Sequence, residues 1–157
     1  MPKVTLPPVQ AAEDAAHPIL GGGLGPYSYQ LLSDPGGLTQ SGAFIGILPP
    51  GSSTSFRRWH ASEDEMVYIL SGEVVLIEDS EIPMVAGDCA AWPAGMAMGH
   101  CLENRSGTEA RYLVIGTRNR TDIIHYPDHD LTTHKDGKAR RYTHADGAPR
   151  NAGDKND

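Results

Sequence analysis

Short runs of alternating apolar and polar residues recur between Tyr27 and Arg118, separated by clusters of Gly, Pro, Asp and Ser. Runs of this length and composition predict β-strands, and their repeated spacing is typical of an all-β sandwich or barrel. The separating clusters are turn signals, since they supply a fixed φ or tolerate a positive one. We predict strands at residues 27–32, 43–48, 54–60, 65–70, 73–78, 89–92, 98–104 and 109–116.

The segments on either side of this region are predicted to lie outside the barrel. Residues 1–26 are rich in Pro, Ala and Gly and predict an N-terminal arm, because such composition interrupts regular elements. Beyond the last predicted strand the chain turns polar, and Asp-Gly pairs there are hairpin-turn signals. The expected organisation is an arm at 1–26, a barrel at 27–118 and a polar hairpin and tail at 119–157.

Two interpretations of the C-terminal segment are open. It can form a lid or a dimer-forming arm. Alternatively, it is a solvated tail whose first hairpin lies on the barrel and whose end, from residue 148, is disordered. The second is the commoner fate of such composition, so we favour it.

Strand periodicity places a small set of ionisable side chains inside the predicted barrel. Residues two apart face the same side of a strand, so Arg58 and His60 share one face and Glu65 begins the inner face of the next strand. A tight hairpin at 61–64 sets His60 opposite Glu65, and His100 lies on a third inner face. Two imidazoles and one carboxylate that converge in this way suit a divalent metal with open coordination positions.

Composition narrows the class of ligand. The 157 residues carry a formal charge of −7, which argues against the basic surface that nucleic acid or an anionic membrane requires. The chain has no apolar run of membrane-spanning length, and its N-terminus lacks the apolar run of a signal peptide. Cys89 and Cys101 are too few for a disulfide framework, and we expect each of them separately to be a reduced, buried thiol. We therefore expect a cytoplasmic protein that binds a small molecule, with no nucleic-acid or membrane partner.

The same residues resemble the two motifs of the cupin family. In the first motif, Glu65 and Gly72 match the glutamate and glycine, and His60 matches the second of the two histidines before the glutamate. His100 matches the histidine of the second motif, two residues later than in the common form. The other matching positions of the second motif are Gly87, Pro93, Gly95 and Asn104.

This resemblance implies a cupin double-stranded β-helix, or jelly-roll barrel, with a divalent metal such as Zn, Mn, Fe or Ni held by His60, Glu65 and His100. Some cupins are sugar-phosphate isomerases, and others are dioxygenases, decarboxylases, epimerases or non-enzymatic binders, so the fold alone does not select an activity. Cupins commonly form dimers. A homodimer is therefore expected, and Trp59, which alternates away from the interior, is expected at its surface.

Arg58 departs from the family's pattern, because it stands where the first histidine of the motif belongs. A guanidinium cannot coordinate a metal and stays charged. About 5 Å from a dication, at an effective dielectric of about 20, it opposes binding by about 6 kcal/mol. Either Arg58 swings outward and the other three residues keep a metal, or Arg58 pairs with Glu65 and fills the metal's place.

Two functions of different classes fit these residues. The first is a metal-dependent enzyme acting on a small anionic sugar or organic acid, isomerase-like or, as second choice, dioxygenase-like, with His60, Glu65 and Arg58 as catalytic residues. The second is a non-enzymatic ligand-binding barrel whose metal site has decayed. In both, the planar fork of Arg58 binds an anionic group of the ligand, and Phe56 and Met98 are expected as pocket walls.

Glu63 and Asp64, in the predicted turn, are expected to be solvated acids rather than catalytic ones.

Overall fold

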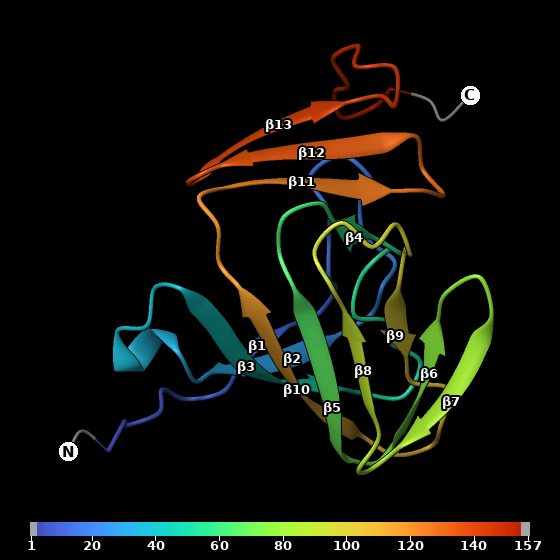
Figure 1. Ribbon diagram of the computed structural model, residues 1–157. Coiled ribbons are helices and arrows are strands. Elements are labelled where there is room, and N and C mark those ends of the chain that lie inside the picture. The colour runs from blue at the N-terminus through green and yellow to red at the C-terminus, as the bar shows by residue number, and fades with distance from the viewer. Residues whose placement is uncertain (1–2, 155–157) are drawn as a thin grey trace.

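The computed structural model describes residues 3–154, which form thirteen β-strands in three antiparallel sheets and one short 3-10 helix, η1 (Asp34–Gly36) (Figure 1). The predicted all-β class is confirmed. The largest sheet has the order β1 (Gln10–Ala12), β2 (Tyr27–Leu31), β3 (Ser41–Leu48), β10 (Ala110–Thr117), β5 (Glu65–Ser71), β8 (Cys89–Trp92). A four-stranded sheet has the order β13 (Ala139–Thr143), β12 (Leu131–Asp136), β11 (Thr121–Tyr126), β4 (Trp59–His60). The third sheet has the order β7 (Glu81–Val85), β6 (Glu73–Ile77), β9 (Cys101–Glu103).

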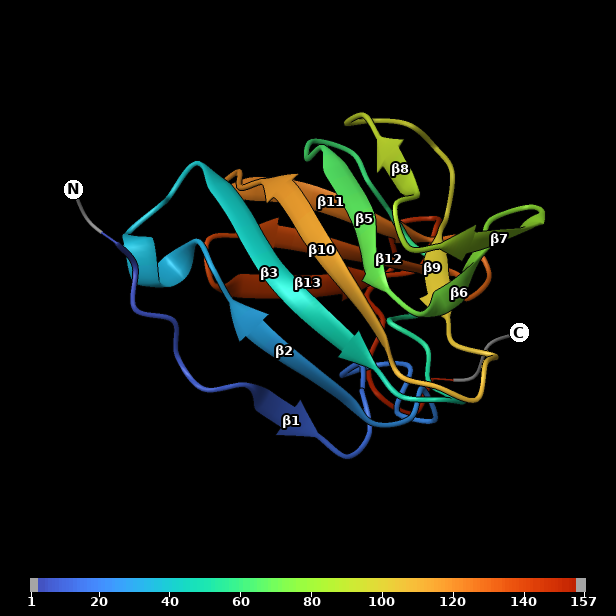
Figure 2. The ribbon, with the colours of Figure 1, turned by 90° about the horizontal axis from the view of Figure 1, so that it is seen from below.

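The sheets enclose a single apolar core. In β5 the alternation is plain, because Val67 and Ile69 are buried while Tyr68 and Leu70 between and after them are exposed. Figure 1 shows β11–β13 above the six-stranded sheet, and in Figure 2, seen from below, they lie behind it. The buried core residues are Leu48, Val67, Ile69, Val74, Leu76, Met84, Trp92, Leu102, Ala110 and Tyr112.

The C-terminal segment is a structural part of the molecule: the favoured interpretation is right that a hairpin packs on the barrel and wrong that a disordered tail begins at residue 148. Strands β11, β12 and β13 form a meander that pairs with β4 through His60 and Trp59. Arg150, beyond the meander, is only 4% exposed and donates to the carbonyl oxygens of His129 and Asp130. The segment is polar in composition although several of its polar residues are buried, among them Asp122, Thr132, Thr133 and Thr143. Residues 155–157 of the predicted disordered end lie outside the described residues.

Four other strand predictions differ from the structure. The predicted arm contributes β1, which pairs with β2, and β7 was missed because Pro83 demotes its sequence as a strand. The predicted strand at 54–60 is reduced to Trp59–His60, and the one at 98–104 is reduced to Cys101–Glu103. In the rest of each predicted strand, isolated β-bridges and single backbone hydrogen bonds between the two segments replace continuous strand pairing.

The predicted hairpin at 61–64 is absent. β4 pairs with β11, whereas β5 pairs with β10 and β8, so the turn carries the chain from one sheet to another.

Both cysteines are free thiols, and the expected burial is confirmed for Cys101 but wrong for Cys89, which is exposed. Within residues 3–154, no helix has the length and apolar character needed to cross a membrane.

Strand β3 has glycine at two positions where a large side chain from another segment packs directly against its backbone. A Cβ on Gly46 would lie 2.1 Å from Cζ of Tyr112, the residue directly opposite on β10. A Cβ on Gly42 would lie 2.7 Å from Nε of Arg118. Glycine at these two positions therefore lets Tyr112 and Arg118 lie flat against the sheet.

We predict that Gly46→Ala lowers the free energy of unfolding by about 1–3 kcal/mol, the usual cost of overpacking a core. The added methyl group cannot share space with the buried Tyr112 ring. Urea-induced unfolding measures the change. Gly107→Ala is the control, because a Cβ there meets nothing within 4 Å. Equal stability of the two variants would show that the ring moves without cost.

Candidate functional site

A cavity of about 500 Å³ lies inside the barrel, within the size range of small-molecule sites. The ionisable residues predicted to converge there, His60, Glu65, His100 and Arg58, all line it. Aromatic residues from the six-stranded sheet, including Tyr27, Phe44 and Tyr112, form much of the remaining wall. The cavity thus combines an apolar wall with a small group of charged residues.

The two imidazoles approach the same carboxylate oxygen. His60 Nε2 lies 3.4 Å from Glu65 Oε2, and His100 Nε2 lies 3.5 Å from it. His100 is held by a 3.0 Å contact between its Nδ1 and the carbonyl oxygen of Met98, and its ring stacks on Trp92 at 3.6 Å. The proximity of His60 and Glu65 therefore does not need the predicted hairpin, because the two residues come from facing sheets.

His100 Nε2 is a buried polar atom with no hydrogen-bond partner among the described residues. Because Nδ1 faces a carbonyl, which only accepts, the ring proton belongs on Nδ1 and Nε2 carries a lone pair. That lone pair and the Glu65 carboxylate are both acceptors, and acceptors gathered around one point suit a cation between them. The donor set of His60, Glu65 and His100 therefore fits a divalent transition metal.

A second group of ligand atoms also lies close together. Atoms of His60, Glu63 and Asp122 all lie within 4.8 Å of one another. Two of these groups are already engaged, since Asp122 accepts hydrogen bonds from His60 and from the Ser62 amide, and Glu63 pairs with Lys135. We therefore regard this group as the support behind His60 rather than as the metal site itself.

Glu65 is ionised in this setting. Burial by itself raises the pKa of its carboxyl, but the close approach of His100 and the positive charge of Arg58 outweigh burial and lower the pKa to about 2. The carboxylate is thus stabilised by its neighbours and keeps its negative charge at any pH near neutrality.

Arg58 follows neither of its two predicted alternatives exactly. Among residues 3–154 no ion pair joins Arg58 to Glu65, and the guanidinium instead meets the hydroxyl of Tyr126 on β11. Burial works against its charge, but Tyr126 and the nearby Glu65 outweigh burial and raise the pKa of Arg58 above its ordinary value. Arg58 remains a cation on the cavity wall and leaves the Glu65 carboxylate to the two imidazoles.

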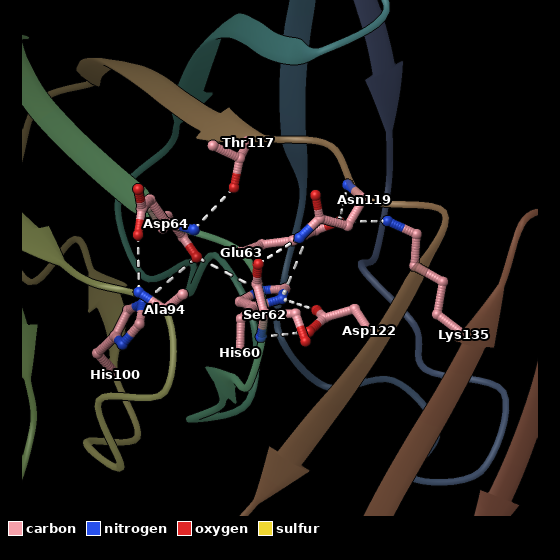
Figure 3. Close-up of polar contacts among 11 residues, drawn as sticks. His60, Ser62, Glu63, Asp64, Ala94, His100, Thr117, Asn119, Asp122 and Lys135 are labelled. Atoms are coloured by element: carbon pink, nitrogen blue, oxygen red, sulfur yellow. Dashed lines mark hydrogen bonds and ion pairs between the residues drawn. The ribbon is translucent and has the colours of Figure 1, made fainter.

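The turn between His60 and Glu65 is tied to the strands that follow the barrel (Figure 3). Ser62 donates its amide to Asp122 Oδ1 at 2.9 Å and accepts from the Asn119 side chain. Glu63 accepts from the Asn119 amide and from Lys135. The turn is therefore held by residues of β11 and β12 and by Asn119 in the link between β10 and β11.

The expectation of a solvated acid is wrong for Glu63, whereas Asp64 is exposed as expected but is engaged by hydrogen bonds. The Glu63 side chain is 13% exposed, and Asp64 accepts the Ala94 amide at 2.7 Å, while its own amide donates to Thr117 Oγ1. Both line the cavity and hold the turn in place.

Phe56 and Met98, predicted as pocket walls, lie elsewhere. Phe56 packs edge-on against His129 at 5.0 Å, and Met98 packs against the core, and neither is among the described residues that line the cavity. Trp59 points away from the interior as predicted, but its ring stacks on His125 at 4.1 Å. One face of the ring is thus covered by a neighbour on β11, and the expected place of Trp59 at a subunit surface stays a prediction.

The comparisons with known proteins identify the family. The model of the cupin domain matches residues 44–116. A crystal structure of a sugar phosphate isomerase of the cupin superfamily from Silicibacter pomeroyi is 38% identical, with a TM-score of 0.87 over 96% of this chain and 98% of that one. The chain belongs to the cupin superfamily. The predicted family and jelly-roll fold are confirmed.

More distant cupin-like structures agree with this assignment. A putative sugar phosphate isomerase from Acidithiobacillus ferrooxidans is 26% identical, with a TM-score of 0.70 over 74% of this cupin and 76% of that chain. A predicted oxalate decarboxylase from Thermotoga maritima is also 26% identical, with a TM-score of 0.55 over 74% and 95%. No curated protein matches the chain.

Three residues of the site lie beyond the cupin-domain match and were missed from the sequence. Asp122, Tyr126 and Lys135 belong to the C-terminal sheet, which was predicted to be a tail. The run Thr121-Asp122-Ile123-Ile124 is a strand signal that extends the β region past Arg118. That signal locates a strand, but nothing local in it indicates that Asp122 meets His60.

We predict that the ionised Glu65 makes folding stability pH-dependent in acid. Its pKa is about 2 in the folded chain, against 4.5 as the ordinary value, so unfolding takes up a proton between these values. The contribution is complete above pH about 4.5 and is lost as the pH falls toward 2. Urea unfolding at a series of pH values in this window tests it.

In the same measurement, Glu65→Gln flattens the pH profile, while Glu109→Gln, which removes a half-exposed carboxylate paired with Arg111, keeps the wild-type slope. A Glu65→Gln profile that runs parallel to the wild type contradicts the assignment of the charge.

Proposed function

We propose that this cupin is a metal-dependent isomerase of a small anionic sugar, of the sugar-phosphate type, whose divalent metal is held by His60, Glu65 and His100. The observation that carries the proposal is the convergence of two imidazole Nε2 atoms on one Glu65 oxygen, at 3.4 and 3.5 Å. The positively charged side chain of Arg58 lines the same cavity. The names of the Silicibacter and Acidithiobacillus structures support the substrate class.

The chemistry required is the transfer of a proton between neighbouring carbons of the sugar. A bound metal supplies a Lewis acid that polarises the carbonyl oxygen. The proton transfer needs a base whose pKa is near neutrality, and imidazole is the side chain that ordinarily meets this requirement. His60 and His100 line the cavity, and either of them can act as this base only while its Nε2 is not bound to the metal.

Other residues of the wall bind and orient the substrate. Arg58 offers the planar, always charged fork that suits a phosphate or carboxylate. Burial raises the pKa of Tyr112 well above its ordinary value, so its hydroxyl stays protonated and can donate a hydrogen bond to a substrate oxygen. The aromatic wall excludes water from the remaining surface of the ligand.

A non-enzymatic ligand-binding cupin is the second candidate, and Arg58 is the observation that favours it. A cation on the wall of the cavity that holds the ligand set opposes a dication electrostatically. If that repulsion dominates, the cavity binds an anionic small molecule without a metal. The homodimer and the cytoplasmic location stay predictions from the sequence.

Metal content separates the two candidates. We expect protein purified without added metal to carry close to one equivalent of a transition metal, measured by inductively coupled plasma mass spectrometry. His100→Ala should lose most of it because a ligand is removed. His125→Ala is the control, since His125 stacks on Trp59 and is not among the residues that line the cavity. Metal-free wild-type protein that still binds sugar phosphates supports the binder instead.

The isomerase itself is tested by solvent exchange. Sugar phosphates incubated with the metal-loaded protein in deuterium oxide should gain deuterium at the carbon next to the carbonyl, detected by proton NMR. The absence of exchange across aldose and ketose phosphates, in protein shown to bind them, contradicts the enzymatic proposal.

Arg58→Met is expected to change metal and anion binding in opposite directions. Removing the charge relieves repulsion of the metal, so metal affinity rises at least about tenfold, while affinity for a sugar phosphate falls by a similar factor. Isothermal titration measures both. Arg57→Met is the matched control, because Arg57 points outward to Asp79 and Asp128. Parallel changes in the two affinities contradict the role given to Arg58.

A further inference from the structure

His60 presents a different nitrogen to each side of its ring. Nε2 faces Glu65 in the cavity, and Nδ1 lies 2.6 Å from Asp122 Oδ2 on β11. Among residues 3–154, the only other charged partner of Nδ1 is Glu63, whose Oε2 lies 3.7 Å away. Both groups that face Nδ1 are carboxylates, which only accept when ionised, so they favour the ring proton on Nδ1.

Asp122 is itself held in one orientation. Its side chain is completely buried, and its other oxygen, Oδ1, accepts the backbone amide of Ser62 at 2.9 Å. A backbone N–H cannot reverse its role, so Oδ1 is fixed as the acceptor of that bond. Oδ2 is then fixed toward His60 (Figure 3).

From these contacts we propose that Asp122 is a positioning residue that sets the tautomer of His60, keeping Nε2 unprotonated and aimed at the metal position. The inference rests on the proposed function in one respect, which is that the group bound by Nε2 is a metal. It adds a role for the C-terminal sheet, because Asp122 lies outside residues 44–116 that the cupin-domain model matches. His60 of the barrel motif supplies the metal-binding nitrogen, and Asp122 of the C-terminal sheet determines which of its two ring nitrogens carries the lone pair.

Asp122→Asn is a sharp test because the Ser62 amide dictates how the new side chain sits. The amide oxygen has to accept from Ser62, so the NH₂ group faces His60 Nδ1. A donor at that position requires Nδ1 to become an acceptor, and the ring proton moves to Nε2. The substitution is isosteric, yet it turns the metal-facing nitrogen into a donor.

Two readouts are combined. Long-range ¹H–¹⁵N correlation NMR of metal-free protein, labelled at histidine, distinguishes protonated from unprotonated ring nitrogens. Titration with Zn²⁺ alone gives the metal affinity. We expect the Nδ1–H form of His60 in the wild type, the Nε2–H form in Asp122→Asn, and Zn²⁺ affinity about 10- to 100-fold weaker in the variant, the usual cost of losing such a partner.

The chain offers a matched control on the far side of the same meander. Asp130 Oδ2 lies 2.9 Å from His144 Nδ1, and Asp130 Oδ1 accepts the Ala145 amide at 2.8 Å, the same pair of contacts that Asp122 makes. This pair is outside the cavity lining. Asp130→Asn should therefore leave both the His60 spectrum and the Zn²⁺ affinity unchanged.

The outcomes separate this inference from the proposed function. A wild-type His60 with a proton on Nε2 overturns the inference, and this measurement needs no variant to fold. Equal Zn²⁺ affinity of wild type and Asp122→Asn also overturns it while leaving the metal site intact. If the wild type binds no Zn²⁺, the proposed metal site fails, whereas the tautomer change in Asp122→Asn alone still supports the positioning role of Asp122.

Discussion

The structure of the site depends on keeping one carboxylate ionised inside a barrel. Glu65 is mostly buried, and an isolated charge in such a place is costly unless other groups compensate it. His60 and His100 approach one of its oxygens, and Arg58 adds positive charge nearby. His60 and Arg58 come from the segment around β4, and His100 comes from the segment before β9, so the negative charge at Glu65 on β5 links different sheets electrostatically as well as by packing.

The compensation extends outward through a second set of polar residues. Asp122 stands behind His60, Tyr126 stands beside Arg58, and Lys135 pairs with Glu63 in the turn. All three outer residues belong to the C-terminal meander. The meander therefore contacts the site through polar side chains. These contacts orient His60, Arg58 and the turn that holds Glu63. A buried polar network of this kind contributes specificity of arrangement as much as free energy.

The cupin scaffold leaves its chemistry to be decided by these particular residues. A histidine in place of Arg58 makes an ordinary four-ligand set, whereas the guanidinium keeps a positive charge beside a carboxylate and two imidazoles. Such a site is suited to an anionic ligand whose charge offsets Arg58. The guanidinium therefore acts in two directions in the proposed function. Its charge lowers the affinity of the site for a divalent metal and raises its affinity for an anionic substrate.

The sequence by itself determined the all-β class, the family and the inner faces of the barrel strands. Period-two alternation put Glu65 with Val67 and Ile69, and motif spacing singled out His60 and His100, because these signals depend only on residues near each other in the chain. Only the tertiary structure decided that His60 and Glu65 belong to different sheets, that Arg58 turns to Tyr126, that Phe56 and Met98 leave the cavity, and that Asp122 meets His60. Asp122 and His60 are 62 positions apart, and a polar strand that is buried by hydrogen bonds has the same composition as a solvated tail. Alternation tells which side of a strand a residue faces, but the partner on that side is chosen by how the sheets pack.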